Sequence, residues 1–189
     1  MATVQLNRDA IVQAAIEILD TYGLNDMTMR RVATQLSVAP GALYWHISNK
    51  QELIHAIADD ILSPVLGAEA RTPKDPQELC ETLEELLLAH RDGSELIASA
   101  LAQPSSSLRA DVEKLLATTL KGQGVGDTTA ETAARGLLHL LLGAGMQLQM
   151  QQQFAETLGE GETEAAGDAV RGDVSAQVEL LLRAVSGRH

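Results

Sequence analysis

Apolar residues recur at helical spacing along most of the chain, and stretches that alternate apolar and polar residues are short. Residues 8–22 show the pattern, and their inward positions would be Ile11, Ala14, Ala15, Ile18 and Tyr22. Leucine, alanine, glutamate and glutamine are abundant, and these residues are good helix formers. The pattern therefore predicts an all-α protein.

Three short helices are predicted before residue 50. The first spans residues 8–22, because Asn7 is a suitable N-cap and Gly23 a suitable C-terminal stop. Thr28 should cap the second helix, whose inward positions are Met29, Val32, Ala33 and Leu36. The third should have about two turns, with Pro40 in its first turn. Joined by a tight turn at Ser37, the second and third helices form the helix-turn-helix pattern.

Six further helices are predicted in the rest of the chain. A long helix starts near Lys50 behind a capping box of Asn49 with Glu52 or of Ser48 with Gln51, and Pro64 should kink or end it. The next helix opens with Asp75 as N-cap and Pro76 in its first turn. The others are expected at residues 95–102, 108–120, 128–154 and 169–186. The Gly-rich, acidic residues 158–173 are expected to be mobile.

The net charge of -12 is distributed unevenly and does not exclude binding to nucleic acid. Residues 1–50 contain as many basic as acidic residues, so the whole acidic excess lies after residue 50. Within this neutral segment, Arg30, Arg31 and Lys50 flank a group of aromatic residues. Salt screens charges that are more than about 8–10 Å apart, so a local basic patch can bind phosphate in an acidic protein.

Other classes of protein are disfavoured by the sequence. The N-terminal stretch MATVQLNRDA lacks the apolar region of a signal peptide, and the most apolar run, residues 136–150, is too short to cross a bilayer. The one cysteine, Cys80, lies in an amphipathic run where inert burial is expected. We find no Gly-rich phosphate loop, HExxH motif, metal-spaced ligands or nucleophile beside a base. We expect a cytoplasmic protein that is not an enzyme and uses no metal or cofactor.

An unusual aromatic cluster lies in the third predicted helix. The chain has one Trp, two Tyr and one Phe, yet Tyr44, Trp45 and His46 are consecutive. Three neighbouring residues cannot share one face of a helix, so at least one of them should act outside the core. Trp45 could instead pack across the first and fourth helices, and the sequence leaves both interpretations open.

A short helix of this kind can enter the major groove of DNA and present its first residues to base edges. The small residues Pro40, Gly41 and Ala42 would permit a close approach. Tyr44 can hydrogen-bond a phosphate or contact a thymine methyl group. Lys50 can pair with phosphate where the start of the next helix adds positive potential.

The segment TMRRVATQLSVAPGALYWHISNKQELIHAIADDIL resembles the N-terminal DNA-binding region of the tetracycline-repressor family of bacterial regulators. LYWH followed by NK at this distance is a specific signal, and the likeness covers residues 7–62, with a weaker continuation through LLLAHRDG. By this resemblance, the DNA contacts are Thr28, Arg30, Pro40, Gly41, Ala42, Tyr44, Trp45, His46 and Lys50. Pro40 stands where the family's namesake reads a base with glutamine, so the operator sequence is not carried over.

The resemblance also implies an all-helical homodimer in which the last two helices of each subunit form a four-helix bundle. The sequence agrees, because residues 128–154 and 169–186 carry more apolar surface than one core needs. A two-fold dimer would place two recognition helices about 34–36 Å apart, on a palindromic site. We therefore expect a helix-turn-helix domain at residues 1–49 and a ligand-binding and dimerisation domain at residues 50–189.

A ligand cavity with aliphatic, methionine-containing walls is expected among the C-terminal helices, and it would suit an apolar small-molecule inducer. The candidate lining residues are Leu62, Leu66, Leu87, His90, Leu101, Leu138, His139, Leu142 and Met146. Two alternatives stay open: His139 as a core histidine, and a cationic ligand attracted by the acidic surface. The segment after HRDG lacks the histidine that grips the tetracycline–magnesium complex in the family's namesake, so tetracycline is not the expected ligand.

These observations lead to one main hypothesis and one alternative. The main hypothesis is a ligand-responsive transcriptional repressor that binds a palindromic operator as a homodimer and is released by a small-molecule inducer. The alternative is a ligand-sequestering helical dimer without operator-specific DNA binding, which Pro40 at a base-reading position favours.

Overall fold

The computed structural model describes residues 6–158 and 164–187, and for residues 164–173 it describes the backbone alone. Over these residues the chain consists of helices joined by turns, without a strand, which confirms the all-α prediction. The helices are α1 (Arg8–Tyr22), α2 (Met29–Gln35), α3 (Pro40–Leu43), α4 (Lys50–Leu66), α5 (Pro76–Leu88), α6 (Gly93–Leu101), α7 (Leu108–Gly122), α8 (Asp127–Leu158) and α9 (Glu164–Val185).

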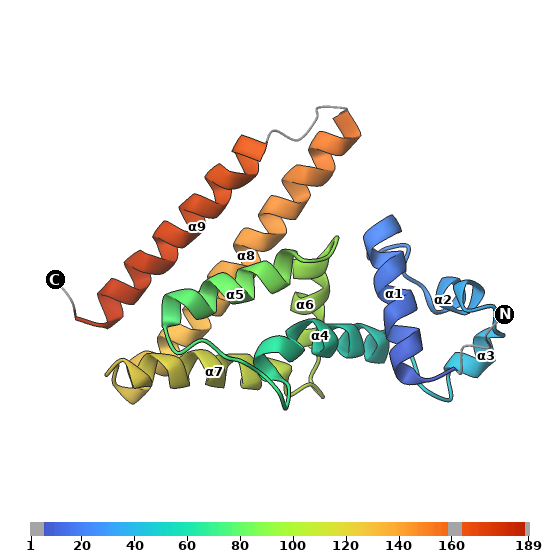
Figure 1. Cartoon of the computed structure of the whole chain (residues 1–189), viewed down its shortest axis with the longest axis horizontal. Coiled ribbons are helices and arrows are strands. Elements are labelled where there is room, and N and C mark those ends of the chain that lie inside the picture. The colour runs from blue at the N-terminus through green and yellow to red at the C-terminus, as the bar shows by residue number, and fades with distance from the viewer. Residues whose placement is uncertain (1–5, 159–163, 188–189) are drawn as a thin grey trace.

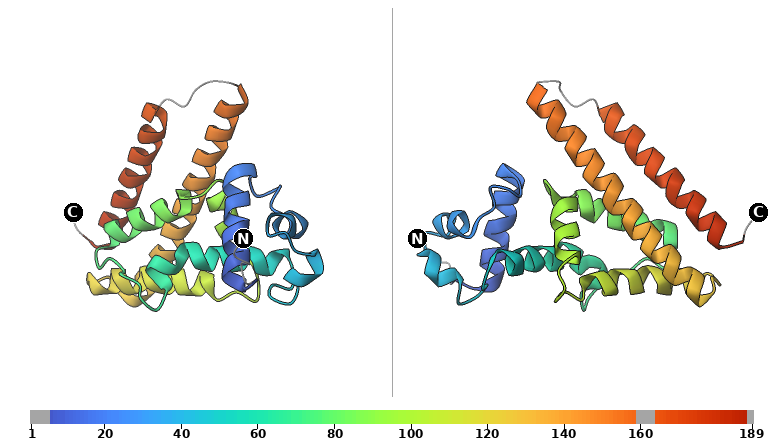
Figure 2. Two further views of the ribbon diagram at one scale, coloured as in Figure 1. Left: turned by 45° about the vertical axis from the view of Figure 1, so that its right-hand side comes forward. Right: turned by 180° about the vertical axis from the view of Figure 1, so that it is seen from behind.

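The helices form a small N-terminal unit and a larger helical body, connected by α4 (Figure 1). In the small unit, α1 packs against α2 and α4, and α2 packs against α3. In the larger body, α4 contacts α5, α6 and α7, while α8 runs along α5, α6 and α7 and pairs with α9. Figure 2 shows that the far ends of α8 and α9 project beyond the other helices as an antiparallel pair.

Four N-caps predicted from the sequence are confirmed, because in each a side-chain oxygen accepts from a backbone N–H of the first turn. These N-caps are Asn7, Thr28, Asn49 and Asp75. At the start of α4, the capping pair is Asn49 with Glu52, and the alternative pair of Ser48 with Gln51 is wrong. The Glu52 carboxylate accepts from the Ser48 hydroxyl at 2.6 Å and from the Ser48 N–H at 2.7 Å. These two hydrogen bonds hold the pKa of Glu52 below its ordinary value.

The predicted helix boundaries agree in part with the structure. The helix α3 has one turn rather than two. The helix α4 ends two residues beyond Pro64, close to where the proline was expected to kink or end it. The backbone of residues 164–173 is helical although a mobile segment was predicted there, because glutamate and alanine favour a helix. Residues 159–163 of that segment lie outside the described residues.

The small unit has a dense core, but one of its predicted members lies outside it. Ile11, Ile18 and Leu19 on α1 are buried. Tyr22 was predicted to face inward, and this is wrong: its side chain is 52% exposed. Tyr22 is the last residue of α1, and its ring lies beneath the Arg31 guanidinium, 4.1 Å from the centroid.

Cys80 behaves as the sequence predicts. It is buried on α5 among apolar side chains, and burial, followed by the nearby acidic residues, raises the pKa of its thiol to about 12. The thiolate form that reacts with electrophiles and metals is therefore suppressed at neutral pH.

Candidate nucleic-acid interface and ligand groove

The turn between α2 and α3 positions the aromatic cluster. Ser37 has a φ of 56°, in the left-handed region that glycine usually occupies. The Val38 N–H donates to the carbonyl of Ala33 at 3.0 Å, which closes α2 and redirects the chain into α3. Leu43 and Ile47 are then fully buried against the core of the small unit. These two anchors fix which side of the short α3 segment faces solvent.

The aromatic cluster between the two anchors faces outward. Tyr44 is 51% exposed, Trp45 is 90% exposed, and His46 is exposed beside them. The alternative in which Trp45 packs across the first and fourth helices is therefore wrong. A large aromatic residue without an internal packing role indicates a contact surface for another molecule.

The adjacent arginines of α2 have different surroundings. Arg31 pairs with Asp26 at 2.5 Å and stacks on Tyr22, so its guanidinium is held against the protein. Arg30 is exposed and has no ion pair or side-chain hydrogen bond within the described part of the chain. Thr28, the N-cap, accepts from the Arg31 N–H at 3.2 Å and keeps its hydroxyl proton for an outside acceptor. Thus the side chains of Arg30 and Thr28 are free to contact DNA, whereas the guanidinium of Arg31 is already occupied by Asp26 and Tyr22.

Lys50 lies at the edge of this surface. It is half-buried, and its ammonium donates to the Leu24 carbonyl at 3.3 Å. An ammonium has three donors, so two remain for an outside acceptor at the N-terminus of α4. The basic patch predicted from Arg30, Arg31 and Lys50 is thus reduced to Arg30 and the two remaining N–H donors of Lys50.

Gly41 lies on the same exposed surface, next to the exposed Pro40 and the half-buried Ala42. A Cβ atom added at Gly41 would meet nothing within 4 Å, so packing within the protein does not require glycine there. Replacing Gly41 with alanine should stabilise the fold by about 0.5 kcal/mol, because glycine is a poor helix former. The same methyl group should weaken DNA binding about threefold or more, because it occupies the space between α3 and the groove.

Thermal denaturation and a fluorescence titration with DNA measure these two effects. Gly122→Ala is the matched control, because Gly122 lies at the end of α7 with equally open surroundings. It should affect stability similarly and leave DNA binding unchanged. Unaltered DNA binding by Gly41→Ala would place the DNA contact elsewhere.

The loop between α5 and α6 connects the small unit to α8. Asp20, on α1, accepts from the Arg91 N–H at 3.2 Å and contacts His90 Nδ1 at 3.0 Å. The side chain of Gln149, on α8, donates to the His90 carbonyl at 2.8 Å and accepts from the Ser94 N–H at 3.1 Å. The loop is therefore held from both sides by side chains of α1 and α8.

Asp92 extends this connection. Its carboxylate accepts from the Leu24 N–H at 2.7 Å, and its other oxygen accepts from the side chain of Gln153 on α8. Arg91 also pairs with Glu156 at 3.2 Å. A polar cavity of about 250 Å³ lies among these residues. Because its polar groups bond to one another, this region is suited to couple the two parts of the protein rather than to bind a ligand.

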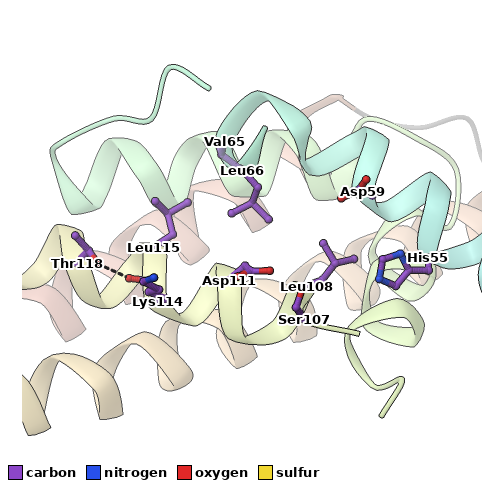
Figure 3. A pocket seen from close by; sticks show the side chains of 10 residues that line it. All are labelled: His55, Asp59, Val65, Leu66, Ser107, Leu108, Asp111, Lys114, Leu115 and Thr118. Carbon is purple, nitrogen blue, oxygen red and sulfur yellow. Dashed lines mark hydrogen bonds between the residues drawn. The ribbon is translucent and has the colours of Figure 1, made fainter. Parts of the chain in front are cut away.

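A groove of about 390 Å³ lies between α4 and α7 (Figure 3). Its lining residues are His55, Asp59, Val65, Leu66, Ser107, Leu108, Asp111, Lys114, Leu115 and Thr118. Aliphatic side chains from both helices and charged side chains alternate along it. Periodicity alone does not reveal the charged residues of this groove, because their spacing on α4 and α7 is also that of an ordinary solvated helix face.

The nine residues predicted to line a ligand cavity have different surroundings in the described structure. Leu66 lines the α4–α7 groove, and His90 lines the polar cavity near α1. Met146 is half-buried and His139 is exposed on α8. The others are buried in the core: Leu62, Leu87, Leu101, Leu138 and Leu142.

Both helices of the α8–α9 pair expose large apolar side chains. On α8, Phe154 is 63% exposed, and the helical repeat places it on the same face as Gly143 and His139. A Cβ at Gly143 would meet nothing within 4 Å, so this face has room for another helix. On α9, Leu180 is 68% exposed. An apolar face of this kind indicates a protein–protein contact.

Neither metal clusters nor membrane-spanning helices occur in the part of the chain that the structure describes. No three His, Cys, Asp or Glu side chains there are grouped to hold a metal ion. None of the helices there combines the length and hydropathy that a bilayer span needs.

Comparison with known proteins identifies the family. The model of the tetR family of bacterial regulatory proteins matches residues 11–57, which contain the turn and the aromatic cluster. Tetracycline repressor protein class C of Escherichia coli is 27% identical over 184 residues, covering 94% of this chain and 82% of that protein. The crystal structure of BioQ from Mycobacterium smegmatis has a TM-score of 0.81 and 33% identity, covering 98% of this chain and 100% of BioQ. BioQ with its natural double-stranded DNA operator matches with a TM-score of 0.75 over the same shares of both chains, again at 33% identity. The chain therefore belongs to the tetR family of bacterial regulatory proteins and is a transcriptional regulator of that family.

Proposed function

We propose that the protein is a repressor that binds a palindromic operator as a homodimer and leaves it when a small molecule binds to the C-terminal helices. The observation that carries this proposal is the outward orientation of Tyr44, Trp45 and His46 on a segment held by Leu43 and Ile47. A rigidly anchored helix with exposed aromatic and polar tips fits the major groove of duplex DNA.

In this proposal, residues 1–49 read DNA and residues 50–189 bind the ligand and the second subunit. The DNA contacts are Thr28, Arg30, Pro40, Gly41, Ala42, Tyr44, Trp45, His46 and Lys50. Arg30 and Lys50 would pair with phosphate, while Tyr44 and the small residues of α3 would approach the bases. The acidic charge after residue 50 would keep the larger body away from the DNA backbone.

The homodimer would form through the exposed apolar face of α8 and α9. Phe154 on α8 and Leu180 on α9 are too exposed to contribute fully to the core of one chain. A two-fold contact between two such helix pairs makes a four-helix bundle, in which the same face of each subunit is buried. The dimer would set the two recognition helices one turn of DNA apart, at about 34–36 Å.

Release would follow from a movement of α4 relative to the body. Lys50 at the start of α4 lies beside the small unit, and Leu66 at its end lines the α4–α7 groove. The loop contacts of Asp20 and Asp92 hold the small unit in register with α8. A ligand that binds the displaced arrangement about 100-fold more tightly supplies roughly 2.7 kcal/mol toward release.

Footprinting on the DNA upstream of the protein's own gene, followed by titration of the protected duplex, tests the proposal. We expect a protected palindrome bound with a dissociation constant on the order of 10 nM at physiological salt, and binding at least about 1,000-fold weaker to random duplex. Equal affinity for both duplexes would contradict operator recognition. It would favour a ligand-sequestering dimer, an alternative that the exposed Pro40 supports because proline offers no side-chain donor to a base.

A further inference from the structure

We propose that the groove between α4 and α7 binds a linear zwitterion, with a protonated amine at one end, a carboxylate at the other and an aliphatic chain between them. The inference rests on the proposed function, because it takes this groove as the site of the effector. It differs from the apolar inducer expected from the sequence.

The shape of the groove favours a chain-like ligand. His55 and Leu66 delimit it along α4, and eleven helical residues rise by about 16 Å. Its volume of about 390 Å³ lies in the range of small-molecule sites. Leu66 and Leu115 point toward each other from α4 and α7 and provide apolar contacts in the part between the charged groups (Figure 3). An aliphatic chain lying along this surface would be removed from water on two sides.

The charged side chains of the groove are arranged by sign. Asp59, with His55 one turn before it on α4, lies toward one end, whereas Lys114 on α7 lies toward the other (Figure 3). Asp111 lies between them on α7. In the described part of the chain, neither Asp59, Asp111 nor Lys114 has an ion pair or a side-chain hydrogen bond. These groups are free to pair with a ligand.

A zwitterion satisfies both signs, whereas simpler amphiphiles do not. The amine of the ligand would pair with Asp59 and Asp111, and its carboxylate with Lys114. A fatty acid would place its uncharged chain against two carboxylates, and an alkylamine would leave Lys114 without a partner. Selectivity against these two classes follows from the charges they leave unpaired.

The groove is placed to act on the DNA-reading unit through α4. Gln51, in the first turn of α4, accepts through its carbonyl from the Gln103 side chain at 3.0 Å. Gln103 lies in the segment that leads to Ser107 and the start of α7. On the other side of α4, Asp60 accepts from the side chain of Gln13 on α1 at 3.3 Å. A ligand that changes the spacing of α4 and α7 would therefore alter the contact of Gln103 with Gln51 and the contact of Gln13 with Asp60. The second of these joins α4 to the small unit.

Isothermal titration calorimetry of the full-length protein tests the proposal with ω-aminohexanoic, ω-aminooctanoic and ω-aminoundecanoic acids. Octanoic acid and octylamine are the matched single-charge controls. We expect at least one ω-amino acid to bind with a dissociation constant below about 1 mM, and at least fivefold more tightly than either control. No saturation by any ω-amino acid up to about 10 mM, or equal binding of octanoic acid, would overturn the proposal.

Variants assign the binding to the groove. Asp111→Asn and Lys114→Gln should each weaken binding of the ω-amino acid at least fivefold. Glu85→Gln and Lys74→Gln remove the same charges from exposed positions outside the groove and should leave binding unchanged. Equal losses in all four variants would indicate a general charge effect and overturn the assignment.

Titration of the operator duplex with and without the ω-amino acid separates this proposal from the proposed function. Weaker operator binding in its presence supports both. Binding of the ω-amino acid at the groove with unchanged operator affinity supports the zwitterion site and contradicts its role as the effector site. Operator binding by a protein that takes up no ω-amino acid contradicts the zwitterion site and leaves the repressor proposal standing.

Discussion

Replacing Tyr44 with alanine should weaken operator binding by at least about tenfold, equivalent to about 1.4 kcal/mol. The ring is 51% exposed and lies between the buried anchors Leu43 and Ile47, so its position is fixed while its outer edge is free. Removing it would delete the proposed contact to the bases or phosphates without disturbing the anchors. The free energy of unfolding should change by less than about 0.5 kcal/mol, as for other exposed positions.

Tyr22 offers a closely matched control. It is 52% exposed and belongs to the same small unit. It lies at the end of α1, away from α3, and its ring stacks on Arg31 of α2. Tyr22→Ala should leave operator affinity within about twofold of the original, a difference of about 0.4 kcal/mol. A fluorescence titration with labelled operator measures both variants. Similar losses in the two would mean that the small unit is destabilised in general and that Tyr44 is no specific contact.

The small N-terminal unit was predictable from the sequence because its signals are local. Asn7, Thr28 and Asn49 each cap a helix within three residues of the N–H group that they satisfy. The tight turn at Ser37 was expected from the spacing of two helices, although serine rather than glycine occupies its left-handed position. Such features depend on neighbours in the sequence, so they can be recognised without knowing the tertiary structure.

The orientation of Trp45 and Arg31 depends on how the short helices pack together and was not decided by the sequence. Helical spacing permits Trp45 to pack inward or outward, and only the assembled unit shows that Leu43 and Ile47 already fill the inner face. Arg31 is withdrawn from the basic patch by Asp26 and Tyr22, which precede it in the chain. Neither of these two Arg31 contacts follows from periodicity, because both depend on the angle between α1 and α2.

The surroundings of the predicted ligand residues also depend on the tertiary structure. Apolar residues such as Leu87 and Leu138 were expected to line a cavity, but close packing buries them in the core. The α4–α7 groove contains Asp59 and Lys114, which a pattern-based interpretation assigns to solvent. A groove arises from the spacing of two helices, and that spacing is set by side chains from several other helices at once.

Replacing Phe154 with aspartate should convert the dimer to monomers and lower operator affinity at least about a hundredfold. Phe154 is 63% exposed on the face of α8 that includes Gly143. In a two-fold dimer the substitution occurs twice in one interface. If each buried aspartate costs about 2 kcal/mol or more, the pair weakens dimerisation by about 4 kcal/mol, roughly a thousandfold.

Leu180→Asp on α9 should have the same effect, because Leu180 is 68% exposed on the helix that pairs with α8. Ala110→Asp is the control, since Ala110 is exposed on α7, outside the α8–α9 face. Analytical ultracentrifugation measures the oligomeric state, and circular dichroism checks that helix content is retained. A Phe154→Asp protein that stays dimeric and binds the operator normally would place the subunit contact on another surface. If it becomes monomeric and still binds the full palindrome tightly, one subunit suffices for recognition, and the link between subunit pairing and half-site spacing fails.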